Sequence, residues 1–503
     1  MTSTGTFRFE EATIDQIHAA MNSGDLTARD LVEGYLARIE AYDRSGPNLN
    51  SIVELNPRAL EQAEELDEAF ARSGEFAGPL HGIPILIKDC IETRDAPTTF
   101  GSEAFEGYRP AEDATVIENL REAGAVVLAK TTLPDFATSW WAYSSMSGET
   151  RNPYALDRDP GGSSAGTGAA IAANLGAVGL GTDCGGSIRL PASFDNVVGV
   201  RSTPGLVSRH GVGCLVFFQD TIGPMTRTVK DAAAVMDALV GYDPEDSLTA
   251  AYAVARAPES YLDVLDANAL RDARIGLVTN TLGPDDDPLV APVNRVVAGA
   301  VRDMKDAGAE MVEVEIPDLQ DHLAATSMYV DRTKHDINGF LAARPDAPVK
   351  TLQEIHDSKR YHPRLDLLEL CATEGPDDPE SDPEYFRRFA ARERFARVLV
   401  NILARNNLDA FVYPSVQVAP PTREILNTGR WTTLTFPTNT LIASQSWLPA
   451  ITVPGGFTDE GLPVGMEFVA RSCDESTAFK LAYAFEQATG HRRAPQSTPE
   501  LSS

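Results

Sequence analysis

The sequence predicts an α/β fold, in which α-helices pack against a β-sheet. Short apolar segments of strand length, such as residues 83–87, 177–182 and 310–314, alternate with segments in which apolar residues recur at helical spacing. Because this alternation continues along most of the chain, it favours α/β over all-helical or all-β folds. The chain has 503 residues, of which 43% are hydrophobic, so it is long enough to bury a large core.

The individual elements follow from local patterns. Residues 9–42 are expected to form two helices, because Thr27 and Asp30 have the spacing of a helix cap and apolar residues follow at helical intervals. The apolar run 83–87 is expected to be a buried strand. Further strands are expected at residues 125–128, 177–182, 197–200, 275–278, 310–314, 408–413, 451–453 and 464–468. Further helices are expected before the strand at 125–128 and at residues 166–175, 188–194, 229–239, 289–307 and 476–489.

Two other segments depart from this simple alternation. Residues 220–227, DTIGPMTR, are expected to form a turn before the helix at 229–239. Residues 316–405 are more helical and more polar than the rest, with an acidic break at 374–384. Polar insertions of this kind often carry specificity, so we expect this region to form a cap over the site.

Composition narrows the class of protein. The net charge of −30, from 43 basic and 73 acidic residues, disfavours binding to nucleic acids and to anionic membranes. The first residues show no signal-peptide pattern, and no apolar run approaches a membrane span. Five irregularly spaced cysteines fit reduced thiols in the cytoplasm. The eight histidines form no HExxH motif, so a metal site is not expected. No cofactor is expected either.

The most informative stretch is residues 158–193, which contains two Gly-Gly-Ser turns at 161–163 and 185–187. Paired glycines let backbone N–H groups approach a ligand closely, and a loop that opens into a helix offers unsatisfied donors. A serine at each turn supplies a nucleophile and a proton carrier. The stretch therefore predicts a catalytic centre.

Lys88 closes the predicted strand at 83–87 and has two interpretations. A lysine at a strand end commonly reaches solvent or a carboxylate, here Asp89. In a dry site, however, desolvation lowers the pKa of the amine and leaves a neutral base. Near the second turn, Asp183 and Arg189 are interpreted as a structural ion pair. Cys184 is expected to contribute its backbone N–H rather than a nucleophilic thiol.

A loop at residues 139–152 is rich in aromatic and hydroxyl side chains. Trp140, Trp141 and Tyr143 are candidates to line an apolar pocket, and ordinary packing is the alternative interpretation.

Several motifs together resemble the amidase signature family. They are HGIPILIKD, the block 161–190, DTIGPMTRTV, YPS, LPAITVPGGF and GLPVGMEFV, and they run through most of the chain. The resemblance implies one large domain over residues 1–503, built on a twisted mixed sheet with helices on both sides, with the region 316–405 as a cap-like insertion.

The resemblance also implies a catalytic triad. Ser187 corresponds to the nucleophile, Ser163 to a bridging serine that follows a cis peptide bond, and Lys88 to the base. The N–H groups of Cys184, Gly185, Gly186 and Ser187 would form the oxyanion hole.

Beside these residues, Ser164 corresponds to a supporting hydroxyl. The sequence departs from the usual family pattern at Ala165, Cys184 and Cys90, and at Trp447, where glycine is usual. None of these changes removes a catalytic atom, but Trp447 is expected to reshape the pocket.

The function expected from these residues is hydrolysis of C–N bonds in linear amides through an acyl-enzyme. Aryl and aliphatic amides, carbamates and esters are candidate substrates, with the chain acting as a monomer or homodimer on a small molecule. The alternative is the glutaminase subunit of a tRNA-dependent amidotransferase. An esterase with Ser164 in a G-x-S-x-G turn is disfavoured because no strand precedes that turn. A non-enzymatic binding protein is disfavoured because all three triad positions are filled.

Overall fold

The protein is described here by a computed structural model covering residues 7–255 and 257–501. Its strands are β1 (Ile52–Leu55), β2 (Pro84–Lys88), β3 (Val126–Thr131), β4 (Tyr143–Ser144), β5 (Gly148–Glu149), β6 (Val178–Asp183), β7 (Val198–Arg201), β8 (Thr221–Thr226), β9 (Arg274–Val278), β10 (Glu310–Val314), β11 (Ala410–Pro414), β12 (Ala450–Phe457) and β13 (Pro463–Val469). Eleven of them form one sheet in the order β1-β3-β2-β6-β8-β7-β12-β13-β11-β9-β10, and β4 and β5 form a separate hairpin. The large sheet mixes parallel and antiparallel pairs, which confirms the expected α/β fold with a mixed sheet.

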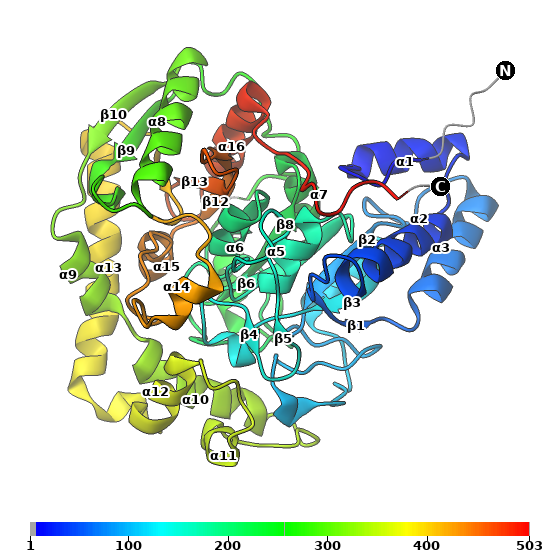
Figure 1. Cartoon of the computed structure of the whole chain (residues 1–503), viewed down its shortest axis with the longest axis horizontal. Coiled ribbons are helices and arrows are strands. Elements are labelled where there is room, and N and C mark those ends of the chain that lie inside the picture. The colour runs from blue at the N-terminus through cyan, green and yellow to red at the C-terminus, as the bar shows by residue number, and fades with distance from the viewer. Residues whose placement is uncertain (1–6, 256, 502–503) are drawn as a thin grey trace.

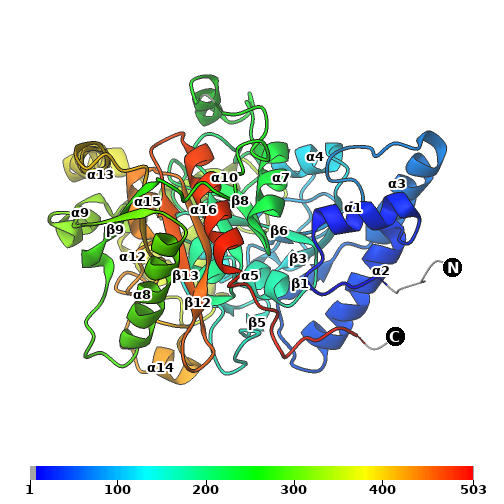
Figure 2. The same ribbon diagram turned by 90° about the horizontal axis from the view of Figure 1, so that it is seen from above.

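Helices flank the large sheet (Figure 1). They are α1 (Ile14–Ser23), α2 (Ala28–Arg38), α3 (Ala59–Ser73), α4 (Thr115–Glu122), α5 (Ala165–Ala172), α6 (Arg189–Phe194), α7 (Val229–Leu239), α8 (Ala291–Asp306), α9 (Leu319–Thr326), α10 (Tyr329–Ala342), α11 (Leu352–Ser358), α12 (Asp366–Glu374), α13 (Pro383–Arg405), α14 (Arg423–Asn427), α15 (Leu441–Ser446) and α16 (Glu475–Thr489). In both views α1–α3 lie at one end of the molecule and α8, α9 and α13 at the other, as Figure 2 shows from above. Within the described ranges, we find no helix with the length and hydropathy needed to span a bilayer.

The central strands bring the candidate site segments together at the ends of β2 and β6. β2 pairs in parallel with β3 and with β6, and the side chains of β2 and β6 are buried along their whole length. Continuous burial is typical of parallel strands that are covered on both faces. Because β2 and β6 run in the same direction, Lys88 at the end of one lies beside Thr182 near the end of the other.

The close packing of helix α5 accounts for its small residues. All its side chains are buried, and a Cβ atom added at Gly166 would lie 2.4 Å from the backbone nitrogen of Thr132. Such an approach of backbone to backbone is possible only for glycine. The helix therefore packs tightly against the core and fixes the turn that precedes it.

The expectation of a turn at residues 220–227 was wrong, because most of this segment forms β8 between β6 and β7. Glycine and proline are rare in central strands. Here Gly223 is required, since an added Cβ would lie 2.0 Å from the carbonyl oxygen of Val200. The ladder between β8 and β7 includes only Thr226 and Met225, so it stops before Pro224, which has no N–H to contribute.

Candidate active site

Lys88 lies at the end of β2 and is fully buried. Its Nζ atom is 2.7 Å from the Oγ atom of Ser163 and 2.8 Å from the Oγ1 atom of Thr182. It forms no ion pair with any residue in the described ranges. The structure therefore brings together the lysine and the first serine that the motifs indicated.

The electrostatics of this position favour a neutral amine. Burial lowers the pKa of Lys88, and the more distant acidic groups, among them Cys90, Asp220 and Asp183, oppose this only in part. A neutral amine has two N–H groups, which suit the hydroxyl and the carbonyl of Thr182, and a lone pair, which can accept from the Ser163 hydroxyl. The contacts around Nζ thus match those of a base.

The first Gly-Gly-Ser turn is fixed to the sheet by its neighbours. The peptide bond between Gly162 and Ser163 is cis, as the resemblance implied. The Ser164 hydroxyl donates to the Thr182 carbonyl at 3.2 Å and accepts from the Thr182 N–H at 3.3 Å. Ser164 therefore occupies a supporting position, with its hydroxyl directed at the end of β6.

The second turn, residues 184–187, is held by its carbonyl groups. The Cys184 carbonyl accepts from the Gln219 amide at 2.5 Å, and the Gly185 carbonyl accepts from the Thr440 hydroxyl at 2.8 Å. The Gly186 carbonyl accepts from the Leu190 N–H at 2.7 Å, and the Ser187 carbonyl accepts from the Ser164 N–H at 3.0 Å. In the part of the chain that the structure describes, none of the N–H groups of residues 184–187 donates to another protein group. The N–H group of a trans peptide unit points opposite to its carbonyl, so these donors are left free for a ligand.

The shape of this turn requires its glycines. Gly186 has a φ of +135°, and an added Cβ would lie 1.9 Å from the Oγ1 atom of Thr440. At Gly185 an added Cβ would lie 2.6 Å from the hydroxyl oxygen of Tyr329. Both glycines are therefore needed for close approach, as the paired motif suggested.

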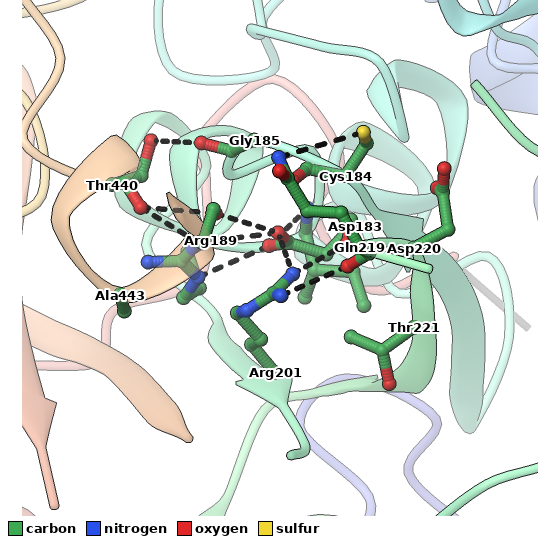
Figure 3. Close-up of polar contacts among 12 residues, drawn as sticks. Asp183, Cys184, Gly185, Arg189, Arg201, Gln219, Asp220, Thr221, Thr440 and Ala443 are labelled. Carbon is green, nitrogen blue, oxygen red and sulfur yellow. Dashed lines mark hydrogen bonds and ion pairs between the residues drawn. The ribbon is translucent and has the colours of Figure 1, made fainter. Parts of the chain in front are cut away.

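A buried charge network supports the turn from below (Figure 3). Asp183 pairs with Arg189 at 3.0 Å and with Arg201 at 2.9 Å, and all three side chains are buried. Burial alone would raise the pKa of Asp183, but the two guanidinium groups outweigh it and lower the pKa to about 2. Arg201 also donates to the Asp183 carbonyl at 2.6 Å, which orients the N–H of Cys184. The Cys184 thiol itself has a pKa raised well above the ordinary value by burial, so it stays protonated.

Ser187 opens onto a cavity of about 520 Å³. Its hydroxyl has no hydrogen-bond partner among the residues that the structure describes, and it faces the same space as Cys184 and Gly185. Trp140 also lines the cavity, and its Nε1 atom donates to the Thr433 carbonyl at 2.7 Å.

Trp141 and Trp447 lie outside the lining, contrary to their expected places in the pocket. Trp141 packs edge-on against Phe436 at a centroid distance of 6.1 Å. Trp447 has a φ of +59° at the end of α15, and its ring packs against Phe218 and Phe389.

The walls of the cavity carry no formal charge. Among the lining residues that the structure describes there is no Asp, Glu, Lys, Arg or His, and the polar groups are hydroxyls and amides such as Gln320, Asn439 and Gln445. Part of the wall comes from α9, the start of α10 and α12, so the region 316–405 contributes directly to the cavity.

Three positioning groups escaped the sequence analysis, namely Thr182, Gln219 and Thr440. Thr182 had a usable signal, since a parallel pairing of the strands at 83–87 and 177–182 places it beside Lys88. Gln219 and Thr440 reach the turn only through tertiary contacts, and no local pattern marks them.

Comparisons with known proteins agree with this geometry. A model of the amidase family matches residues 30–479. The chain is 34% identical over 508 residues to a glutamyl-tRNA(Gln) amidotransferase subunit of Microcystis aeruginosa, with 97% of this chain and 99% of that protein covered. It is 32% identical over 511 residues to a probable amidase of Arabidopsis thaliana, with 98% and 93% covered. The fold is similar to the peptide amidase of Stenotrophomonas maltophilia, with a TM-score of 0.84, 36% identity, and 98% of this chain and 99% of that chain covered. The chain therefore belongs to the amidase signature family of hydrolases, which act on C–N bonds.

Proposed function

We propose that this chain is a free-standing amidase that hydrolyses uncharged linear amides through an acyl-enzyme on Ser187. The observation that carries the proposal is the contact of 2.7 Å between the buried Lys88 amine and the Ser163 hydroxyl, together with the cavity that Ser187 lines. An amide substrate is supported by the full-length similarity to a peptide amidase.

The proposed reaction begins with proton transfer. A neutral Lys88 takes the proton of Ser163, which takes the proton of Ser187, and the Ser187 oxygen attacks the amide carbonyl. The two turns are joined by the bond from the Ser164 N–H to the Ser187 carbonyl, so the two hydroxyls lie on neighbouring segments. Contacts of this kind commonly tighten only when substrate is bound.

The developing oxyanion is then stabilised by the free N–H groups of residues 184–187. A preorganised donor of this kind is worth about 3–4 kcal/mol in known enzymes. Ser163 returns the proton to the leaving amine, the C–N bond breaks, and water releases the acyl group from Ser187. A carbamate or an ester presents the same carbonyl to the same donors, so both belong in a test of the substrate range.

The alternative is a glutaminase subunit, which the similarity to an amidotransferase subunit supports. Free glutamine carries an ammonium and a carboxylate, and burial of either charge without a partner costs several kcal/mol or more. The lining of the cavity within the described ranges offers no charged side chain to pair with them. This observation favours a neutral amide, such as an N-acylated peptide amide or an aryl amide, over glutamine.

The test is hydrolysis by the purified single chain of an N-acylated dipeptide amide, an aryl amide, an aliphatic amide, an aryl carbamate, an ester and glutamine. We expect turnover of neutral amides without partner subunits, and loss of that turnover in Ser187→Ala. Retention of activity in Ser187→Ala would contradict the proposed nucleophile. Turnover of glutamine alone would favour the amidotransferase alternative.

A further inference from the structure

Gln219 is a buried side chain outside the cavity, and each polar atom of its amide has a partner. Nε2 donates to the Cys184 carbonyl at 2.5 Å and to the Tyr329 hydroxyl at 3.0 Å. Oε1 accepts a hydrogen bond from the guanidinium of Arg392. Figure 3 shows Gln219 beside Cys184.

Arg392 determines which way the Gln219 amide faces. A guanidinium has only donors, so the amide oxygen must face Arg392 and the NH₂ group must face the Cys184 carbonyl. Arg392 is 1% exposed and comes from α13, and Tyr329 is the first residue of α10. The Gln219 amide thus links two helices of the region 316–405 to the Cys184 carbonyl of the second turn.

The direction of the Cys184 carbonyl fixes the direction of the next N–H group. The carbonyl points at Gln219, which does not line the cavity, whereas Gly185 does. In a planar trans peptide the Gly185 N–H points the opposite way, toward the cavity. We propose that Gln219 is a positioning residue that holds the Cys184–Gly185 peptide unit with its N–H directed at the oxyanion. This inference rests on the proposed function of Ser187.

The experiment measures the rate at which a fluorophosphonate labels the chain. In this reaction the Ser187 oxygen attacks phosphorus, fluoride leaves, and the phosphoryl oxygen occupies the oxyanion hole. We expect Gln219→Met, which has a similar shape but no donor, to be labelled at least about tenfold more slowly than the wild type. With an amide substrate, kcat should fall while KM changes little, because the lost interaction is made in the transition state.

The matched control is Asn56→Leu. Asn56 is also buried, and its amide donates to the Val127 carbonyl at 2.7 Å on the distant strand β3. This variant loses the same kind of hydrogen bond and should be labelled within about twofold of the wild-type rate. Thermal unfolding of each variant establishes that it is folded.

A second variant covers the case in which Gln219→Met does not fold. Gln219→Glu keeps the acceptor for Arg392 but, when ionised, has no donor for the Cys184 carbonyl. Its labelling rate relative to the wild type should rise as the pH is lowered and the carboxyl becomes a donor. A ratio that stays near one at every pH would overturn the positioning role.

The outcomes separate the two proposals. Absence of labelling in the wild type, or labelling of Ser187→Ala, would overturn the proposed nucleophile and with it the basis of this inference. Labelling of the wild type at Ser187 together with an undiminished rate in folded Gln219→Met would overturn only the role of Gln219.

Discussion

Lys88 and its surroundings show how one buried amine can be prepared for proton transfer. Its two hydroxyl contacts, from Ser163 and Thr182, are neutral. Of the carboxylates in its surroundings, Asp89 pairs with Lys130 at 3.0 Å and Asp183 pairs with two arginines, whereas Asp220 accepts from backbone N–H groups. An ion pair at Nζ would have kept the amine protonated. The absence of an ion pair at Nζ among the described residues therefore favours the neutral amine that can act as a base.

Replacement of Lys88 should abolish the base without removing the nucleophile. We expect Lys88→Ala to lower kcat by a factor of about 10²–10⁴, the usual contribution of a positioned base. Lys88→Arg should be equally impaired, because a guanidinium keeps the charge but has no neutral form.

In the wild type, activity should rise with pH through the pKa of Lys88, which burial places below 10.5. A pH–rate profile of kcat/KM measures this limb. A limb centred at or above 10.5, or full activity in Lys88→Arg, would contradict the role of a neutral lysine.

At the scale of residues, the sequence was sufficient to identify candidate site residues wherever they belong to a local motif. Short segments with characteristic residue types contain the two serine turns and Lys88. Such a segment also contains Asp183 and Arg189, which form an ion pair in the structure. Trp447 shows the limit, since its identity suggests a pocket wall but its ring packs against Phe218 and Phe389 outside the cavity. A side chain's direction depends on φ and ψ, which a single residue type does not determine.

At the scale of elements, the second turn combines free N–H groups with tightly packed glycines. Gly186→Ala should displace the turn, because the new methyl group would meet Thr440 and the residue would keep a positive φ. We expect a loss of about 1–3 kcal/mol in the free energy of unfolding and about a hundredfold loss in kcat. Urea unfolding and steady-state kinetics measure the two effects.

Gly74→Ala is the control that separates the effect of backbone strain from the effect of the contact with Thr440. Gly74 ends α3 with a φ of +71° and has no atom within 4 Å of an added Cβ. This variant should lose stability but keep its activity. Equal kinetic effects in the two variants would show that the contact with Thr440 does not matter.

The elements themselves were largely predictable, and β8 is the instructive exception. Its neighbours β6 and β7 are apolar and were recognised from their composition. The segment of β8 contains Gly223 and Pro224, which locally favour a turn. Only the two flanking strands, which pair with it in the sheet, make it a strand. Pairing between distant segments overrides local propensity there.

At the scale of the whole molecule, burial of carboxyl groups links stability to pH. Desolvation raises the pKa of Asp135 and Glu486 to about 7 and that of Asp220 and Asp231 to about 6. A raised pKa means that folding takes up protons. Stability from these groups is therefore present at low pH and is lost as the pH rises toward their folded pKa values.

Asp135→Asn tests this linkage at one position. The wild-type carboxyl has a folded pKa of about 7 against an ordinary value of 3.8, so it favours folding less as the pH rises between those values. The variant should show a shallower decline in the free energy of unfolding across this range, by at most about 1.4 kcal/mol per pH unit. Urea unfolding at a series of pH values measures the slopes. Parallel slopes for the two proteins would refute the assignment.

The carbonyl groups of the second turn have a consequence for how such chains diverge. Their side-chain partners, Gln219 and Thr440, belong to segments far from the turn in the sequence, and Arg392 acts on it through Gln219. A descendant chain that lost these partners would still display an intact Gly-Gly-Ser sequence. Retention of the motif is therefore a necessary sign of this chemistry in a relative, whereas retention of the distant partners is the more demanding evidence that the turn still has its shape.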